Sequence, residues 1–410
     1  MTPELKGFLL LSIIKLLVVF IVLLVGVALL TLMERKVAGW MQNRPGPNRV
    51  GPTGILQPVA DGIKNFIKEE TQPGGANGIL FTLAPALSFV PAMMLIAVVP
   101  LAAPVRVDFD WNLPLIGLAV FHGLTAVAVA DLPMGFLFIL AFSSIGVYGI
   151  AIAGWSSNSK YSLLGGLRAS AQMISYEVAM GLSLIPVLLL TGNVTFSEVI
   201  ARQQAGLWFI GPLFISFFVF LISGFAETNR LPFDMPEAES ELVAGYHSEY
   251  SSMKFAMFMI GEYAHIVTIA AMVATLFFGG WDIPFTRWDE GGGTAQAVAT
   301  FLAFFVKMFF WIFFVMWIRW TLPRFRYDQL MALGWKVLLP LALAYIMVTA
   351  GAIQGLEAAG VTAMRPVALA LTAMNLVLAW LLFNVFDRGR VIRGVSRPTA
   401  AVSARTEGAR

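Results

Sequence analysis

The 410-residue chain contains no cysteine and only three histidines. Without cysteine it forms no disulfide, no thiolate zinc site and no cysteine-ligated iron–sulfur cluster. Three histidines in the whole chain also argue against a haem held by two of them. If the function involves electron transfer, the redox centres are therefore expected in other proteins rather than in this one.

Charge is scarce as well. Only 12% of the residues are charged, whereas 58% are hydrophobic, and the mean hydropathy is +0.80. Several apolar runs exceed about eighteen residues, which is the length of a transmembrane helix and too long for a barrel strand. The sequence predicts an all-α polytopic bundle of about nine spans, at residues 8–33, 79–101, 132–153, 164–190, 208–225, 255–278, 298–320, 337–352 and 366–386.

The segment 111–130 is also apolar, but it contains Pro114 and His122, so we expect an extracytoplasmic connection there. In the alternative, it enters the membrane and reverses the orientation of every later span. Lysine and arginine are concentrated after the first, third, fifth and seventh spans and in the tail, which places those parts in the cytoplasm. We therefore expect a multi-pass protein of the bacterial inner membrane, with its N-terminus outside and its C-terminus in the cytoplasm.

We expect one transmembrane helical domain, residues 1–386, with two functional cytoplasmic loops at 34–78 and 226–254. The first apolar run is too long for a cleavable signal peptide and lacks a small-residue cleavage site, so it is expected to be an anchor. Residues 387–410 are rich in arginine, glycine and serine, which predicts a basic, disordered tail. The basic charge balance belongs to helix ends and this tail, so no nucleic-acid partner is expected.

The first cytoplasmic loop is dense in proline and glycine between Arg44 and Arg49 and just beyond, which disfavours a helix and favours a fixed turn. It is either a plain polar loop or a rigid docking surface. Residues 53–68 then place apolar and polar side chains on opposite faces of one helix, as a helix lying in the membrane interface does. This helix is either a strut on the membrane surface or one wall of a cavity shared with a soluble partner.

Acidic residues gather around the fifth and sixth spans, at Glu227, Asp234, Glu237, Glu239, Glu241, Glu249 and Glu262. An ionised side chain within the bilayer costs at least about 3 kcal/mol, so such placements usually handle protons or ions. Glu177 in the fourth span and Lys307 in the seventh add buried charge. These groups form either a hydrated proton path or a set of paired structural charges beside a solvated acidic loop.

Five ordered motifs resemble the signatures of one family, the quinone-site membrane subunit of respiratory complex I, called the H subunit in bacteria. The resemblance covers about residues 8–352, so the ninth span and the tail lie beyond it. The motifs occupy residues 34–39, 44–52, 56–64, 168–177 and 227–241.

The resemblance implies a subunit of the proton-translocating NADH:quinone oxidoreductase that binds no cofactor or metal and holds no catalytic residue itself. Ubiquinone or menaquinone would be the substrate, and FMN and iron–sulfur clusters would belong to partner subunits. The partners would be the quinone-site subunits of the peripheral arm, the neighbouring small membrane subunits, the antiporter-like subunits and the lipid bilayer.

The resemblance also assigns roles to residues. The quinone chamber would be lined or closed by Arg35, Gln57, Ala60, Asp61 and Phe233. The loops would be ordered against the partner by Glu34, Arg44, Arg49 and Arg230. The acidic path from quinone chemistry to the pumping subunits would consist of Glu177, Glu227, Asp234, Glu237, Glu239, Glu241 and Glu262.

Two other functions are considered. One is the homologous membrane subunit of a related hydrogenase or of a ferredoxin- or coenzyme-linked dehydrogenase. The other is a stand-alone ion-coupled transporter, which would be built from pseudo-symmetric halves with broken helices. The sequence contains no such halves, and its rigid polar loops favour a soluble partner.

Overall fold

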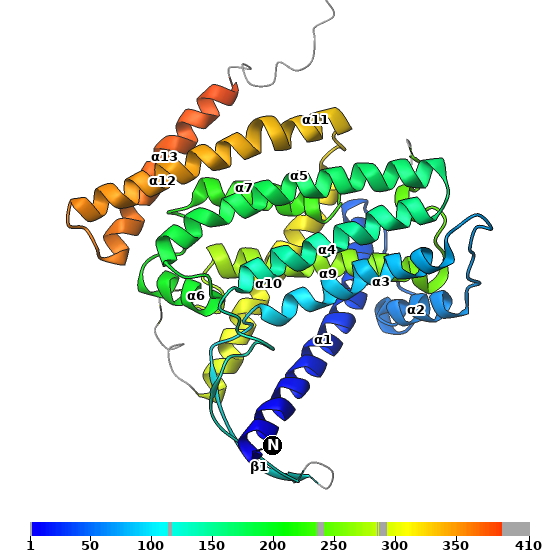
Figure 1. The fold of residues 1–410 in the computed structure, drawn as a ribbon, viewed down its shortest axis with the longest axis horizontal. Coiled ribbons are helices and arrows are strands. Elements are labelled where there is room, and N and C mark those ends of the chain that lie inside the picture. Colours follow the sequence, from blue (N-terminus) through cyan, green and yellow to red (C-terminus); the bar gives the residue numbers. More distant parts are fainter. Residues whose placement is uncertain (1, 114–116, 236–241, 285, 287–292, 388–410) are drawn as a thin grey trace, which may run out of the picture.

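The computed structural model describes residues 2–113, 117–235, 242–284, 286 and 293–387. Over these residues the chain is a bundle of long helices with one β-hairpin and several short helices (Figure 1). Eight of the described helices are long and apolar enough to cross a membrane, and a further apolar helix is shorter. The predicted polytopic helical fold is confirmed, and the long helices lie at the predicted places.

The long helices are α1 (Pro3–Met41), α3 (Gly78–Leu95), α4 (Gly135–Ser156), α5 (Lys160–Thr191), α9 (Ser252–Phe277), α10 (Thr294–Thr321), α12 (Leu339–Ala358) and α13 (Met364–Asp387), and the shorter apolar one is α7 (Phe214–Glu227). The remaining α-helices are α2 (Gln57–Ile67), α6 (Phe196–Ala205) and α11 (Tyr327–Ala332). Short 3-10 turns are η1 (Pro52–Gly54), η2 (Ile96–Val98) and η3 (Gly245–His247), and η5 (Leu333–Leu338) is a π-helical turn that leads into α12.

The centre of the bundle is formed by α3, α4, α5, α7 and α9, which pack on one another in turn. Small residues allow this close approach: a Cβ on Gly149 of α4 would lie 2.8 Å from the backbone nitrogen of Ser88 in α3. Large side chains such as Tyr176, Phe220 and Phe277 are fully buried between the helices. The core therefore combines glycine contacts between backbones with aromatic filling, as is common in membrane bundles.

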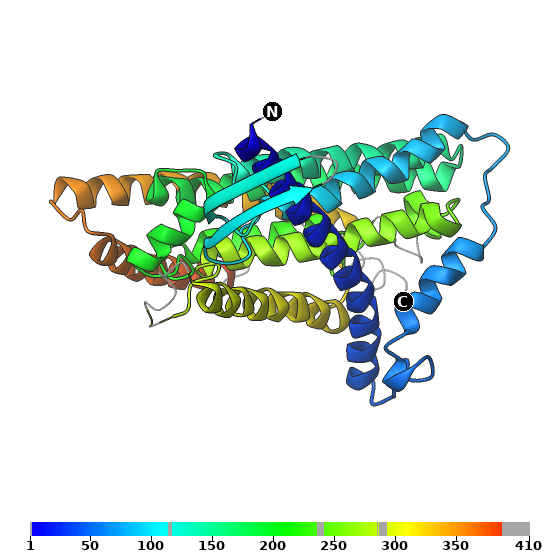
Figure 2. The ribbon, with the colours of Figure 1, turned by 90° about the horizontal axis from the view of Figure 1, so that it is seen from below.

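The helix α1 stands apart from this centre and crosses it obliquely (Figure 2). In its most apolar stretch only 6% of the residues are buried, so the rest of the described chain leaves most of its surface uncovered. At its N-terminal end it contacts the β-hairpin so closely that a Cβ on Gly7 would lie 2.0 Å from the carbonyl oxygen of Val120. The Lys15 ammonium donates to Thr125 Oγ1 at 2.6 Å and to the carbonyl of Ala126 at 2.7 Å.

The hairpin pairs β1 (Val105–Leu113) with β2 (Gly117–Thr125) in antiparallel register, with Asp108 opposite His122. It contains most of the segment that we predicted to be a connection. Apolar and charged residues alternate from Val105 to Trp111, which is the period of a strand. The hairpin that this alternation favours is the β element that the all-α prediction omitted.

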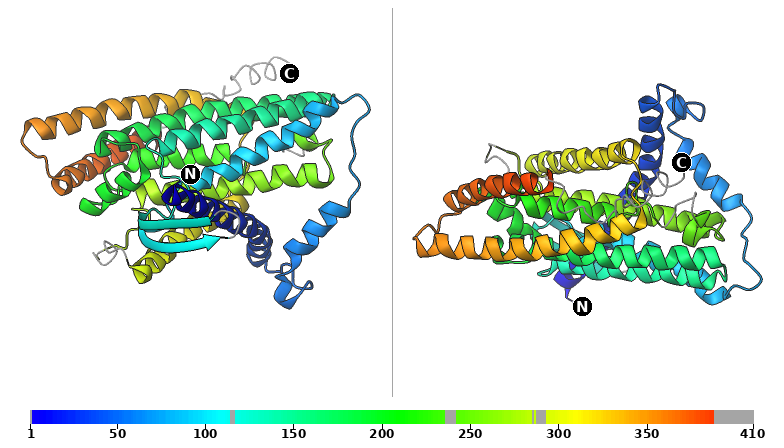
Figure 3. Two further views of the ribbon diagram at one scale, coloured as in Figure 1. Left: turned by 60° about the horizontal axis from the view of Figure 1, so that its bottom comes forward. Right: turned by 90° about the horizontal axis from the view of Figure 1, so that it is seen from above.

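The two ends of the molecule differ in shape (Figure 3). At one end α2 lies at the tip of α1, and at the other the pair α12–α13 extends beyond the central helices. The helix α13 is fastened by Asn375, whose side-chain amide donates to the carbonyl of Pro212 at 2.6 Å and accepts from the Tyr345 hydroxyl at 2.9 Å. The helix α7 begins at Phe214 rather than at residue 208, because Gly211 and Pro212 interrupt the helix before it.

Candidate functional site

The C-terminal part of α1 carries Glu34 into the bundle, where only 5% of the residue is exposed. Its carboxylate accepts hydrogen bonds from the Arg319 guanidinium of α10 and from the Tyr263 hydroxyl of α9. Glu34 therefore joins three helices at one point. The structure places it among buried side chains, although the sequence resemblance assigned it to the ordering of loops.

Arg230, which follows α7, makes a second buried junction. Its guanidinium lies 3.2 Å from Glu262 Oε2 and 4.5 Å from the centre of the Tyr263 ring. The side chains of Arg230 and Glu262 are only 4% and 8% exposed, and the Tyr246 hydroxyl donates to Glu262 Oε1 at 3.1 Å. Buried ion pairs of this kind require such additional polar contacts, because desolvation otherwise outweighs the attraction.

Since Tyr263 contacts both Glu34 and Arg230, the two junctions form one network. We call this set of residues, Glu34, Arg230, Tyr246, Glu262, Tyr263 and Arg319, the arginine–glutamate network. It connects the C-terminal part of α1 with the end of α7 and with the first half of α9.

A second pair of carboxylates comes from α5 and α7. Glu177 in the middle of α5 accepts a hydrogen bond from Ser144 of α4. Glu227, the last residue of α7, is 4% exposed and lies close enough to Glu177 for their charges to interact. Among the described residues, Glu227 Oε2 has no hydrogen-bond partner. The predicted acidic path thus consists here of two groups, the network around Glu262 and the pair Glu177–Glu227.

Asp234 belongs to neither of these two groups. Asp234, 6% exposed, is paired with Arg324, whose Nη2 lies 2.9 Å from Asp234 Oδ2. Glu237, Glu239 and Glu241 lie outside the described residues.

The predicted chamber residues of α1 and α2 lie together. Arg35 pairs with Asp61 at 2.6 Å, and the Gln57 side chain donates to Asp61 at 3.2 Å, with Ala60 half-buried beside them on α2. Phe233 lies elsewhere, packed between Tyr176 and Phe325 with ring centres 5.6 Å from each. The structure therefore brings four of the five predicted chamber residues into one place.

The proline-rich loop between α1 and α2 folds tightly against itself. Gly54 has φ +82°, and a Cβ there would lie 2.1 Å from the carbonyl oxygen of Pro47. Arg44 and Arg49 are exposed on this loop, and Arg44 Nε donates to Gln42 at 2.6 Å. The compact loop agrees with the rigid turn expected from its composition, and both arginines face away from the bundle.

Lys307 is separate from these acids. Its ammonium donates to the backbone carbonyls of Phe278 at 2.8 Å, Gly280 at 2.9 Å and Asp282 at 2.6 Å, just after the end of α9. It also lies 4.3 Å from the ring centre of Trp208. A cation is favourable at the negative end of a helix dipole. Lys307 thus caps α9 at its far end, whereas Glu262 lies in the first half of that helix.

Four residues that contact buried carboxylates were not singled out from the sequence. They are Arg319, Arg324, Tyr246 and Tyr263. Each belongs to the candidate site only through its contact with a buried carboxylate. No local sequence pattern predicts that contact. Within the described part of the chain, no group of three or more His, Asp or Glu side chains is arranged to hold a metal ion.

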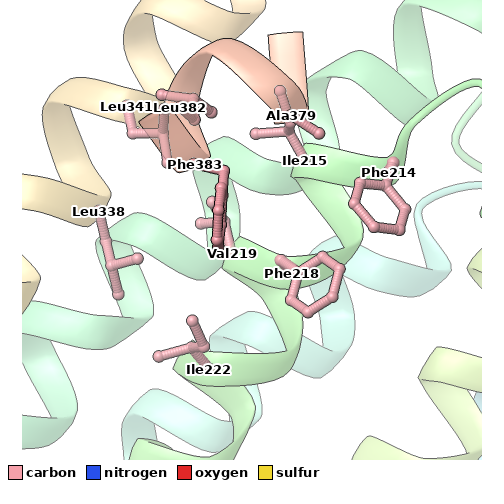
Figure 4. A pocket seen from close by; sticks show the side chains of 10 residues that line it. All are labelled: Phe214, Ile215, Phe218, Val219, Ile222, Leu338, Leu341, Ala379, Leu382 and Phe383. Carbon is pink, nitrogen blue, oxygen red and sulfur yellow. The ribbon is translucent and has the colours of Figure 1, made fainter. Parts of the chain in front are cut away.

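We describe two cavities, one apolar and one polar. A crevice of about 240 Å³ between α7, α12 and α13 is lined only by apolar residues, including Phe214, Phe218, Leu341 and Leu382 (Figure 4). Its side chains offer no polar group for chemistry.

A much smaller cavity of about 10 Å³ lies inside the bundle and is lined by polar side chains, among them Glu227, Glu262 and His265.

These features define a polytopic helical membrane protein in which buried ionic groups connect the helices. Its sequence matches the model of the NADH dehydrogenase family over residues 14–350, and the chain belongs to that family. The match ends before α13, so this helix lies outside the family region.

Curated relatives agree with the family, and the three compared here are all H subunits of NADH-quinone oxidoreductase. The second H subunit of Koribacter versatilis is 52% identical over 348 residues, 84% of this chain and 97% of the relative. The second H subunit of Geobacter sulfurreducens is 49% identical over 335 residues, 82% of this chain and 94% of the relative. The H subunit of Leptospira biflexa is 48% identical over 337 residues, 82% of this chain and 92% of the relative.

Proposed function

We propose that this chain is the membrane subunit of a proton-pumping NADH:quinone oxidoreductase that forms the quinone chamber at the junction with the peripheral arm. Its family and the names of its relatives support this role, and they favour neither of the two alternatives. The observation that carries the proposal is the buried arginine–glutamate network, which begins at the end of α1 beside Arg35 and continues toward Glu227.

The chamber would lie where α1, α2 and α9 meet. Arg35, Gln57 and Asp61 would present charged and amide groups to the quinone headgroup, and Ala60 would leave space beside them. Apolar side chains of α2 such as Val59, Ile63 and Phe66 are exposed, so this helix offers a surface to lipid and to the peripheral arm. Ubiquinone or menaquinone would enter from the bilayer, and its electrons would come from FMN and iron–sulfur clusters of the partner subunits.

Reduction of a quinone to a quinol consumes electrons and protons and changes the charge near Arg35 and Asp61. Glu34 is the residue directly before Arg35, so such a change acts at once on the carboxylate that Arg319 and Tyr263 hold. Coupled carboxyl groups take up and release protons together. The charge change would pass through Glu262 to the pair Glu227–Glu177, and from there to neighbouring membrane and antiporter-like subunits, where it would bias two-state elements.

The loop arginines Arg44 and Arg49 would dock the peripheral arm, because they are exposed on a compact loop next to α2. Glu237, Glu239 and Glu241 would extend the acidic path, as the sequence resemblance implies. The positive-inside charge pattern would place this loop and the C-terminus in the cytoplasm and the N-terminus outside.

The test replaces Glu177 or Glu227 by Gln and measures NADH-driven proton uptake in membrane vesicles. Both variants should lose most of the uptake, because a neutral amide cannot exchange protons. Electron transfer from NADH to a soluble artificial acceptor should stay normal and would report assembly of the complex. Glu198→Gln in α6, an exposed surface pair with Arg202, is the matched control. Normal uptake in both carboxylate variants, with normal assembly, would contradict the proposal.

A further inference from the structure

The small polar cavity lies between the two groups of acids. Glu227 from the end of α7 forms part of one side, and Tyr246 and Glu262 of the arginine–glutamate network form part of another. Ser88 of α3, Gly146 of α4 and His265 of α9 contribute further lining. The cavity is therefore the place where the pair Glu177–Glu227 meets the network.

Its size and lining suit one water molecule. About 10 Å³ of space remains between the side chains, and a cavity of roughly 10–15 Å³ with polar partners holds a single water. Among the described residues, Glu227 Oε2 is buried without a hydrogen-bond partner. Buried carboxylate oxygens without partners are rare and call for one. A water in the cavity would supply it.

His265 is placed to hold such a water. It follows Glu262 by three residues on α9, so both side chains project from the same face of the helix. It is 7% exposed. A Cβ built on Gly146 would lie 3.8 Å from His265 Nε2, with no other atom within 4 Å, so the imidazole edge faces the bare backbone of α4. A neutral imidazole offers one donor and one acceptor nitrogen.

We propose that this cavity binds one water molecule between Glu227 and Glu262, that His265 positions it, and that protons cross from one acid to the other through it. In the transfer, the protonated carboxyl of Glu262 gives its proton to the water, and the water gives one of its own to the carboxylate of Glu227. Glu262 is left ionised, Glu227 is left protonated, and the water is restored. This inference rests on the proposed function and adds the step that joins its two groups of acids.

The sharpest test is Gly146→Ala in the intact complex. The added methyl group meets only His265 Nε2, at an ordinary van der Waals distance, so the helices need not move. It occupies space that the water needs. NADH-driven proton uptake should fall about a hundredfold, the lower end of the range for a lost proton-transfer group, whereas electron transfer from NADH to a soluble acceptor should not change.

The matched control is Gly181→Ala in α5. A Cβ there meets only Leu140 Cδ1, at 3.7 Å, and Gly181 does not line the cavity. Proton uptake in this variant should equal that of the unmodified complex. If Gly146→Ala pumps as well as Gly181→Ala, the water link is refuted.

A second pair of variants separates positioning from packing. His265→Leu removes both polar nitrogens, whereas His265→Gln restores a donor and an acceptor. Uptake should be lost in the first and largely recovered in the second. In the double variant, Gly146→Ala should add little to His265→Leu, because both remove the same water. Equal loss in Leu and Gln variants, with normal assembly, would contradict the positioning role.

The outcomes distinguish this inference from the function on which it rests. If Glu227→Gln abolishes uptake and Gly146→Ala does not, the proposed function stands and the water link fails. If Glu177→Gln and Glu227→Gln both pump normally, the proposed function itself fails.

Discussion

Helix α10 carries two half-buried cations that are held in different ways. Toward the C-terminal end of α10, Arg319 faces the Glu34 carboxylate and belongs to a network with Tyr263, Arg230 and Glu262. In the middle of the same helix, Lys307 faces three backbone carbonyls. A carbonyl dipole cannot take up a proton, whereas a carboxylate can. The carboxylate that Arg319 contacts is therefore able to change its charge, and the three carbonyls that Lys307 contacts are not.

The largest effect is expected from Arg319→Leu. It would leave Glu34 buried without its cation, and breaking one side of a buried ion pair costs about 3–5 kcal/mol. We expect the variant complex to accumulate poorly and its thermal midpoint in detergent to fall. Arg326→Leu, which removes an exposed pair with Asp328, is the control and should have little effect. Equal stability of the two variants would contradict the account of the network.

Lys307→Met sharpens the comparison. It would leave three carbonyls at the end of α9 without their donor and should destabilise the complex by about 1–3 kcal/mol. The ratio of protons pumped to quinone reduced should stay normal in the protein that assembles, because Lys307 lies outside the proposed acidic path. Glu177→Gln, which replaces the acceptor of the Ser144 hydrogen bond, should show the reverse, with a lower ratio at near-normal assembly. A lower ratio in Lys307→Met would show that both sites take part in coupling.

Asp61→Asn tests the chamber rather than the path. The Arg35–Asp61 pair is partly exposed, so its loss should change stability by less than about 1 kcal/mol. The KM for quinone should rise several-fold, while the proton-to-quinone ratio stays unchanged. The measurement is NADH:quinone reductase activity over a range of quinone concentrations. An unchanged KM would remove Asp61 from the proposed chamber.

The smallest effect concerns Tyr250, which lies outside the membrane helices and stacks on Phe81 with ring centres 4.1 Å apart. Burial raises the pKa of Tyr250 to about 12, partly offset by hydrogen bonds to Ser156 and Ser157. The folded state therefore holds this proton more tightly than the unfolded chain does. The resulting stability is complete below the unfolded pKa of about 10 and is lost as the pH rises toward about 12.

Tyr250→Phe should remove this contribution. The thermal midpoint of the variant should fall less steeply with alkaline pH than that of the unmodified complex, and the difference at neutral pH should be about 1 kcal/mol or less. Parallel pH profiles for the two proteins would contradict the assignment.

Much of the fold could be predicted from hydropathy, because the bilayer requires long apolar helices. The prediction missed features that depend on shorter signals. The helix α6 has only ten residues and a polar composition, and the hairpin depends on an alternation over seven residues. The start of α7 depends on Pro212 rather than on hydrophobicity.

The acidic residues of the site stood out in the sequence because carboxylates are rare in this chain. Of their cationic partners, Arg35 and Arg230 were named through the family resemblance. Arg319 and Arg324 were not, because arginine near helix ends is common in membrane proteins. Glu34 and Arg319 are 285 residues apart, and no local pattern links them. That His265 lines the small polar cavity also could not be predicted from the sequence, because it depends on how α9 lies beside Gly146 of α4.

The attachment of α1 has a mechanical consequence. Its N-terminal part contacts the hairpin at Gly7 and Lys15, its C-terminal part contacts α9 and α10 at Glu34, and the apolar stretch between them is largely uncovered by the rest of the described chain. A helix held at both ends bends when the bilayer thins or thickens, whereas a helix held at one end can tilt. Membrane tension would then act directly on the contacts of Glu34. The lateral pressure of the lipid would in this way affect the arginine–glutamate network.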